Sequence, residues 1–148
     1  MEIQQDFRDL LKCFSEHGVE FIIVGGYALA FNGAPRFTGD LDILIRPSAA
    51  NAGRVLSALD EFGFSFPNLA VDDFQSPEKV VQLGVPPIRI DLITSISGVS
   101  WDEANAHKVA ALYGDVPVAY LGKAEFIKNK SATGRKKDLA DIEALGEG

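Results

Sequence analysis

The chain has little sulfur and few imidazole groups: its 148 residues include one cysteine, one methionine and two histidines. The single cysteine, Cys13, excludes an intramolecular disulfide, which fits a reducing compartment. No apolar run approaches the roughly 20 residues that a membrane span needs, so we expect no membrane partner. The first residues show no basic segment followed by an apolar one, so we also expect no secretory signal. Together, these absences predict a cytoplasmic protein.

Acidic residues outnumber basic ones, and the formal net charge is −7. This balance argues against a protein that coats nucleic acid. The basic residues are unevenly distributed, however, because six of the 14 Lys and Arg fall between Lys123 and Lys137, where Glu125 is the only acid. Such a segment is typical either of a solvated helix face or of a surface that binds a polyanion, such as a triphosphate or an RNA end. Taken alone it favours the solvated face, and only a link to other candidate site residues favours the polyanion.

Helical and strand patterns follow one another along the chain and predict one domain over residues 1–148, of α/β (α+β) class. We expect a mixed β-sheet flanked by helices rather than an all-parallel sheet. The expected helices cover residues 3–14, 27–32, 49–62, a short stretch after 101, 123–132 and 137–145. The expected strands cover residues 19–24, 41–46, 79–83, 88–93, 109–112 and 116–121. Between 63 and 77 the pattern weakens, which predicts a mobile loop.

Two aspartates interrupt an otherwise apolar strand that contains Asp40-Leu41-Asp42-Ile43. Strand side chains alternate between faces, so Asp40 and Asp42 project side by side from one face. Aspartate is depleted in strands, and adjacent carboxylates repel each other unless a cation lies between them. The pair therefore predicts a divalent metal with oxygen ligands, most plausibly Mg²⁺ beside a phosphate. The simpler alternative is an acidic pair at the exposed start of the strand, with Asp40 in a turn.

A third strand carboxylate follows at Asp91, which shares a strand face with Arg89. If this strand neighbours the one that carries Asp40 and Asp42, the three carboxylates converge. Such a set suits a two-metal phosphoryl-transfer site, with Mg²⁺ or alternatively Mn²⁺ as the ions. For Asp91 alone, a buried ion pair with an arginine is the simpler interpretation. The three acids together favour the metal site, because uncompensated carboxylates would force a proton onto at least one of them.

The order of these features resembles the nucleotidyltransferase superfamily of the DNA polymerase β type. The resemblance rests on Val24-Gly25-Gly26, 13 intervening residues, Asp40-Leu41-Asp42 and the later Asp91. It covers almost the whole chain and is closest to small bacterial AbiEii-like and DUF6036-like proteins, whose ending resembles the segment from Lys130 to Ile142. It implies the minimal nucleotidyltransferase fold.

The resemblance also implies roles for individual acidic and basic residues. Asp40 and Asp42 would bind both metal ions. Asp91 would bind the ion on the nucleophile side and help to remove the proton of the acceptor hydroxyl. Lys130 matches a basic residue that holds phosphates in toxin-like relatives, and Asp138 matches an acid that positions it.

The remaining candidate residues would bind the nucleotide. Gly25 and Gly26 would let the backbone approach the triphosphate, with amides at the start of the following helix as donors. Many members of the superfamily carry a serine after the glycine, whereas here Gly26 is followed by Tyr27. The Tyr27 ring would stack, hydrogen-bond or only pack. Arg36 lies close in sequence to the aspartate strand, so we regard it as a candidate phosphate contact.

These residues predict a metal-dependent nucleotidyltransferase that moves NMP from an NTP to an acceptor hydroxyl and releases pyrophosphate. The toxin-like resemblance favours an RNA end, such as that of a tRNA, as the acceptor, with an antitoxin or another partner protein. The second alternative is an antibiotic hydroxyl of the aminoglycoside or lincosamide type, and the third is a protein hydroxyl. A catalytically idle module that binds nucleotide or a partner is the non-enzymatic alternative, against which the three intact carboxylates argue.

Overall fold

The structure, a computed structural model, describes residues 3–34, 39–63, 69–85 and 88–146. Within these residues, six strands form one mixed sheet in the order β3-β4-β2-β1-β6-β5. The strands are β1 (Phe21–Val24), β2 (Asp40–Ile45), β3 (Val80–Val85), β4 (Ile88–Ile93), β5 (Val109–Tyr113) and β6 (Val116–Tyr120). The helices are α1 (Gln5–Glu16), α2 (Gly25–Phe31), α3 (Ala49–Phe62), α4 (Asp72–Gln75), α5 (Trp101–His107), α6 (Lys123–Thr133) and α7 (Lys136–Ala144). The predicted α+β class with a mixed sheet is confirmed.

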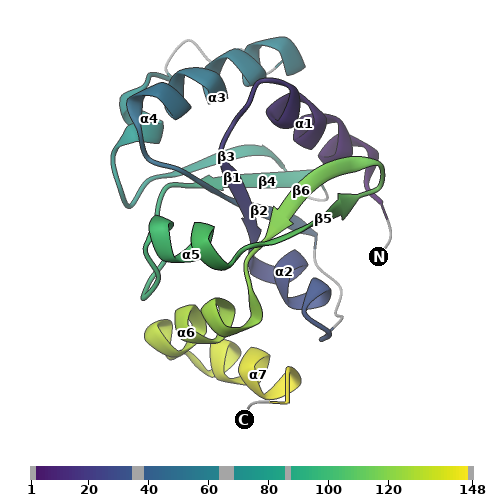
Figure 1. Ribbon diagram of the computed structural model, residues 1–148, viewed down its shortest axis with the longest axis vertical. Helices are drawn as coiled ribbons and strands as arrows, with labels where there is room; N and C mark the ends of the chain where they lie inside the picture. The colour runs from purple at the N-terminus through teal and green to yellow at the C-terminus, as the bar shows by residue number, and fades with distance from the viewer. Residues whose placement is uncertain (1–2, 35–38, 64–68, 86–87, 147–148) are drawn as a thin grey trace.

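Helices cover the sheet from two sides (Figure 1). One face packs against α1, α3 and α4, and its core includes Phe7, Ile43 and Leu59. The opposite face packs against α2, α5 and the C-terminal hairpin formed by α6 and α7, with Leu44 and Phe126 in its core. Adjacent residues of β2 enter different cores because strand side chains alternate between faces. The central strands are therefore buried on both faces, which explains their nearly continuous apolar sequence.

Helix ends lie where capping residues predict them. Helix α3 begins after Ser48, whose hydroxyl accepts a hydrogen bond from the backbone N–H of Asn51, and ends at Gly63 with a φ of 103°. Helix α5 begins in the same way after Ser100, which accepts from the backbone N–H of Glu103. No helix in the described part of the chain combines the length and the apolar character needed to cross a bilayer.

Several boundaries correct the sequence-based expectation. Strand β1 begins at Phe21, two residues later than expected, and β3 continues to Val85 instead of ending at residue 83. Gly25 and Gly26 form the first turn of α2 instead of a separate turn before it. Helix α4 lies inside the stretch 63–77 that predicted a loop, because Phe74 anchors this short helix in the core. Residues 64–68 of that stretch lie outside the described residues.

Candidate active site

The three predicted carboxylates lie on one face of the sheet, on two neighbouring strands. Strands β2 and β4 are parallel, and their register places Asp42 beside Asp91 and Asp40 beside Arg89. Residues paired in this way point to the same face, here the one that α2 and the C-terminal hairpin cover. The Asp40 side chain is 42% exposed, whereas that of Asp91 is 11% exposed. The condition for convergence, that the two aspartate-bearing strands are neighbours, is therefore met.

Arg89 forms an ion pair with Asp91 and lies near Asp40. Its Nε and Nη2 donate to the two oxygens of Asp91 at 3.1 and 3.0 Å, and its Nε lies 3.9 Å from an oxygen of Asp40. These carboxylates raise the pKa of the guanidinium above its ordinary value, first through the hydrogen bonds that Arg89 donates to Asp91. The simpler interpretation of Asp91, an ion pair with an arginine, is thus realised in this conformation.

Among the described residues, no arginine pairs with Asp42 as Arg89 does with Asp91. Burial, followed by the negative charges of Asp91 and Asp40, raises the pKa of its carboxyl to about 6. The positive charges of Lys130 and Arg89 act in the opposite direction but do not outweigh these effects. In the part of the chain that the structure describes, burial and the neighbouring carboxylates therefore outweigh the effect of these two cations on Asp42.

The junction between β1 and α2 brings the backbone against Asp42. Val24, the last residue of β1, is paired with Asp42, and Gly25 follows it with a φ of +65°. A Cβ atom at Gly25 would lie 2.2 Å from Oδ2 of Asp42, so no side chain fits there. Tyr27, by contrast, packs its ring in the core against Phe7, with ring centroids 5.8 Å apart. The structure favours the packing interpretation for the Tyr27 ring, and the glycine backbone is what approaches the carboxylates.

The C-terminal hairpin contributes a buried carboxylate with two cationic neighbours. Asp138 is fully buried, and its Oδ1 lies 3.6 Å from Nζ of Lys130. Arg135 donates to Asp138 through Nε at 2.7 Å and Nη2 at 3.2 Å, and the backbone N–H of Arg135 donates to the same carboxylate. The hydrogen bond from Arg135 holds the pKa of Asp138 well below its usual range. Lys130 and Asp138 thus lie together, and the charge of Lys130 reaches Asp42.

Sequence reasoning gave no role to Arg89 or to Arg135. The alternation of strand side chains shows that Arg89 shares a face with Asp91, and this spacing already indicates an ion pair. Arg135 stands three residues before Asp138, a spacing typical of a side chain that pairs with the first turn of a helix. The predicted phosphate contact Arg36 lies outside the described residues.

The residues present suit a divalent cation in type and in charge. Carboxylate oxygens are the ligands that Mg²⁺ prefers. Burial, and then the charges of Asp91 and Asp40, raise the pKa of Asp42, and Gly25 keeps the space beside that carboxylate free of a side chain. Within the described ranges, however, no three Asp, Glu, His or Cys side chains lie close enough to one another to hold a metal ion as they stand. In this conformation the Arg89 guanidinium donates to both oxygens of Asp91.

Solved structures with a similar fold include proteins described as nucleotidyltransferases or nucleotidyltransferase-like. TM1012 from Thermotoga maritima, a proposed nucleotidyltransferase, matches 99% of this chain and 94% of its own, with a TM-score of 0.61 and 16% identity. The lincosamide antibiotic adenylyltransferase LnuA, bound to lincomycin, matches 97% and 96%, with a TM-score of 0.56 and 15% identity. An antigenic nucleotidyltransferase-like protein from Paracoccidioides brasiliensis matches 95% and 72%, with a TM-score of 0.52 and 16% identity.

These likenesses show that the chain has the fold of nucleotidyltransferases. No protein-family model matches the sequence, and a search of curated proteins finds no relative. The closeness to AbiEii-like and DUF6036-like proteins therefore stays a prediction from the sequence.

Proposed function

We propose that this chain is a metal-dependent nucleotidyltransferase, which transfers NMP from an NTP to an acceptor hydroxyl and releases pyrophosphate. The observation that carries the proposal is the register of β2 and β4, in which Asp42 is paired with Asp91. The junction between β1 and α2 lies next to Asp42 on the same face of the sheet. Mg²⁺ or Mn²⁺, when bound, would supply the positive charge that stabilises the phosphates during transfer.

The acidic residues hold the cations and the acceptor. Asp40 and Asp42 are proposed to bind the ions through their carboxylate oxygens. Asp91 would orient the acceptor hydroxyl and accept its proton as the hydroxyl oxygen bonds to the α-phosphorus and the bond to pyrophosphate breaks. Arg89 has to leave Asp91 for this step, because a carboxylate held in a two-bond ion pair is a weak base.

Backbone and basic groups position the triphosphate. The absence of a side chain at Gly25 lets a phosphate approach the backbone beside Asp42, and Gly26 extends this surface into the first turn of α2. Lys130 adds a positive charge that already acts on Asp42, and Asp138 holds the lysine in place. In this proposal, catalysis comes mainly from positioning and from charge stabilisation.

The acceptor is proposed to be an RNA end, in a cytoplasmic setting of the toxin–antitoxin type. The basic C-terminal hairpin supports a polyanionic acceptor, whereas an antitoxin or other partner protein is supported by the sequence resemblance alone. An antibiotic hydroxyl is the second candidate. It is favoured by the likeness to the lincosamide adenylyltransferase LnuA, which covers 97% of this chain and 96% of that chain.

The experiment uses purified protein, Mg²⁺, each α-labelled NTP in turn, and bulk RNA or lincomycin as acceptor. We expect label in RNA and pyrophosphate release, both lost in Asp42→Ala and after chelation of the metal. Label in lincomycin alone would select the second candidate. Metal-dependent NTP binding without pyrophosphate release from any acceptor would contradict the enzyme and leave the idle binding module.

A further inference from the structure

Arg135 is firmly held and yet largely open to solvent. Its guanidinium donates through Nε and Nη2 to the fully buried Asp138, although its side chain is 65% exposed. An arginine side chain has five N–H donors in a planar fork, so donors remain for a further anion after this pairing. The buried carboxylate thus fixes the guanidinium in one orientation, which lowers the entropic cost of binding a phosphate.

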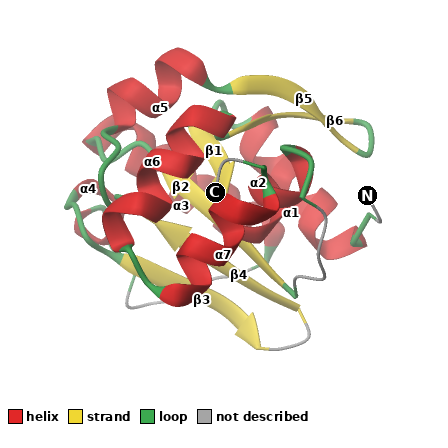
Figure 2. Cartoon of the chain, turned by 90° about the horizontal axis from the view of Figure 1, so that it is seen from below, coloured by secondary structure: helices red, strands yellow, loops and turns green. Residues whose placement is uncertain are grey.

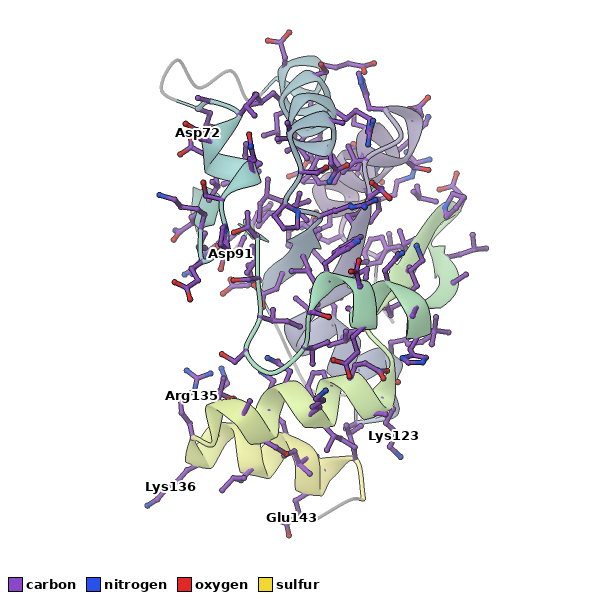
Figure 3. All side chains as sticks on the ribbon, turned by 60° about the vertical axis from the view of Figure 1, so that its left-hand side comes forward. Asp72, Asp91, Lys123, Arg135, Lys136 and Glu143 are labelled. Atoms are coloured by element: carbon purple, nitrogen blue, oxygen red, sulfur yellow. The ribbon has the colours of Figure 1, made fainter. Side chains whose placement is uncertain are left out.

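The position of Arg135 distinguishes it from the other basic residues of the hairpin. Figure 3 shows the side chain on the same side of the molecule as Asp91, extending toward the sheet. The side chain of Lys136 extends away from the sheet, and Lys123 lies at the far end of the hairpin. Seen from below, the start of α7 is drawn in front of β3, and Figure 1 shows the hairpin lying below the sheet (Figures 1 and 2). Of the three labelled hairpin cations, Arg135 is therefore the one directed at the part of the sheet that carries Asp91.

Beside the buried Asp91, the edge strand β3 has exposed side chains. Strand β3 pairs with β4 so that Gln82 lies beside Asp91 and Val80 beside Ile93, which puts both β3 side chains on the face of the three carboxylates. Gln82 is exposed, and Val80 is 62% exposed. Gly25 lies on the other side of the aspartates, beyond β2. If the nucleotide lies on the β1 side of the aspartates, the β3 side of the sheet remains available for the acceptor.

We infer that Val80, Gln82 and Arg135, which we call the acceptor face, bind the single-stranded end of the acceptor RNA, with Arg135 contacting a phosphate. The inference rests on the proposed function and names the surface that brings the acceptor to Asp91. The exposed apolar side chain of Val80 offers a surface for a base, and the amide of Gln82 can both donate and accept hydrogen bonds. The charge of Arg135 favours an anionic acceptor and repels a cationic antibiotic.

The test compares adjacent arginine and lysine residues. Binding of a labelled single-stranded RNA is followed by fluorescence anisotropy over a range of salt concentrations, without NTP. We expect Arg135→Gln to weaken binding about fivefold or more and to reduce the slope of log K against log salt by about 0.7, the effect of one lost phosphate contact. Lys136→Gln removes the same charge one residue away and should stay within about twofold of the wild type.

A second pair of variants avoids the buried network around Asp138. Gln82→Glu places a negative charge on the acceptor face and should weaken RNA binding about threefold or more. Gln75→Glu makes the same change on α4, behind the opposite face, and should leave binding unchanged. Circular dichroism and thermal melting establish that each variant is folded.

Two results would overturn the inference. One is wild-type RNA affinity in both Arg135→Gln and Gln82→Glu. The other is weakened NTP binding with unchanged RNA binding in Arg135→Gln, which would assign the arginine to the triphosphate. Failure of the proposed function would give a different result. In that case RNA would bind the acceptor face, but the wild-type protein would transfer no label to the RNA.

Discussion

Gly25 stands so close to Asp42 that a Cβ atom at the glycine would lie 2.2 Å from Oδ2 of the aspartate. The backbone at Gly25 has a φ of +65°, a conformation that favours glycine for a second, independent reason. The close approach joins the end of β1 to the acidic face of β2. In the proposed function, a nucleotide's phosphates would meet backbone rather than side chains here.

Substitution of Gly25 tests this contact. We expect Gly25→Ala to lose transfer activity by more than about tenfold, because the methyl group displaces the Asp42 carboxylate. It should also lower the free energy of unfolding by about 2 kcal/mol or more. Gly33→Ala is the control, since Gly33 has a φ of +107° but nothing within 4 Å of a Cβ. It should show a conformational cost of about 1 kcal/mol with unchanged activity. Equal activity of the two variants would contradict the role of the contact.

The raised pKa of Asp42 predicts a pH-dependent instability of the metal-free protein. An aspartate whose folded pKa is about 6, above its ordinary 3.8, destabilises the fold as pH rises between these values, because the charged form is disfavoured in the folded state. Asp42→Asn should therefore be more stable than the wild type by on the order of 1 kcal/mol at pH 8, with no difference below pH of about 4. Urea unfolding in EDTA measures this. Asp72→Asn, an exposed acid on α4, should show no such gain, and a less stable Asp42→Asn at pH 8 would refute the prediction.

In the proposed function, Arg89 and a divalent cation would compete for Asp91. Removing the guanidinium in Arg89→Gln should tighten Mn²⁺ binding about fivefold, which corresponds to about 1 kcal/mol for a partly exposed ion pair. Calorimetric titration with Mn²⁺ gives the affinity directly. Arg46→Gln serves as the matched variant, because Arg46 pairs with Glu20 instead. Unchanged or weaker Mn²⁺ binding in Arg89→Gln would show that Arg89 does not occupy the place of an ion.

The charged form of Asp138 should stabilise the C-terminal hairpin at pH values above the ordinary pKa of aspartate. In acid this stabilisation should be lost. Its pKa is depressed, so its contribution is complete above about pH 4 and declines as pH falls further. Asp138→Asn should cost about 1–3 kcal/mol at pH 7, with a smaller difference from the wild type at pH 3. Thermal melting at the two pH values measures the effect. A cost that is independent of pH would mean that the charge of Asp138 does not matter.

Local sequence pattern predicted the elements well, but pairing between distant segments had to come from the structure. Strand alternation places Asp40 and Asp42 on one face without any tertiary information. The pairing of Asp42 with Asp91 joins residues far apart in sequence, and no local rule specifies that register. Helix α4 was missed because it is a single turn, held by Phe74 in the core rather than by its own propensity.

The roles of single side chains were harder to predict than the fold. Tyr27 follows the glycine pair where a phosphate contact is common in the superfamily, but its ring fills the core against Phe7 and Tyr113. For Arg89, the sequence already shows the spacing from Asp91. Whether an arginine pairs with a carboxylate or leaves it available to a metal depends on side-chain geometry, which only the structure gives. Asp138 forms ion pairs with both Lys130 and Arg135. These contacts depend on the turn between α6 and α7, whose geometry residue spacing alone does not define.

The central claim is that Asp40, Asp42 and Asp91 form the metal site at which an NTP reacts. The most direct test is a crystal structure with Mn²⁺ and an NTP analogue that cannot be cleaved between its α- and β-phosphates, in which anomalous scattering locates the ions. We expect Mn²⁺ between the carboxylates of β2 and β4, the triphosphate beside Gly25, and Arg89 moved away from Asp91. Nucleotide bound elsewhere, or no Mn²⁺ at these aspartates while Arg89 still holds Asp91, would contradict the account.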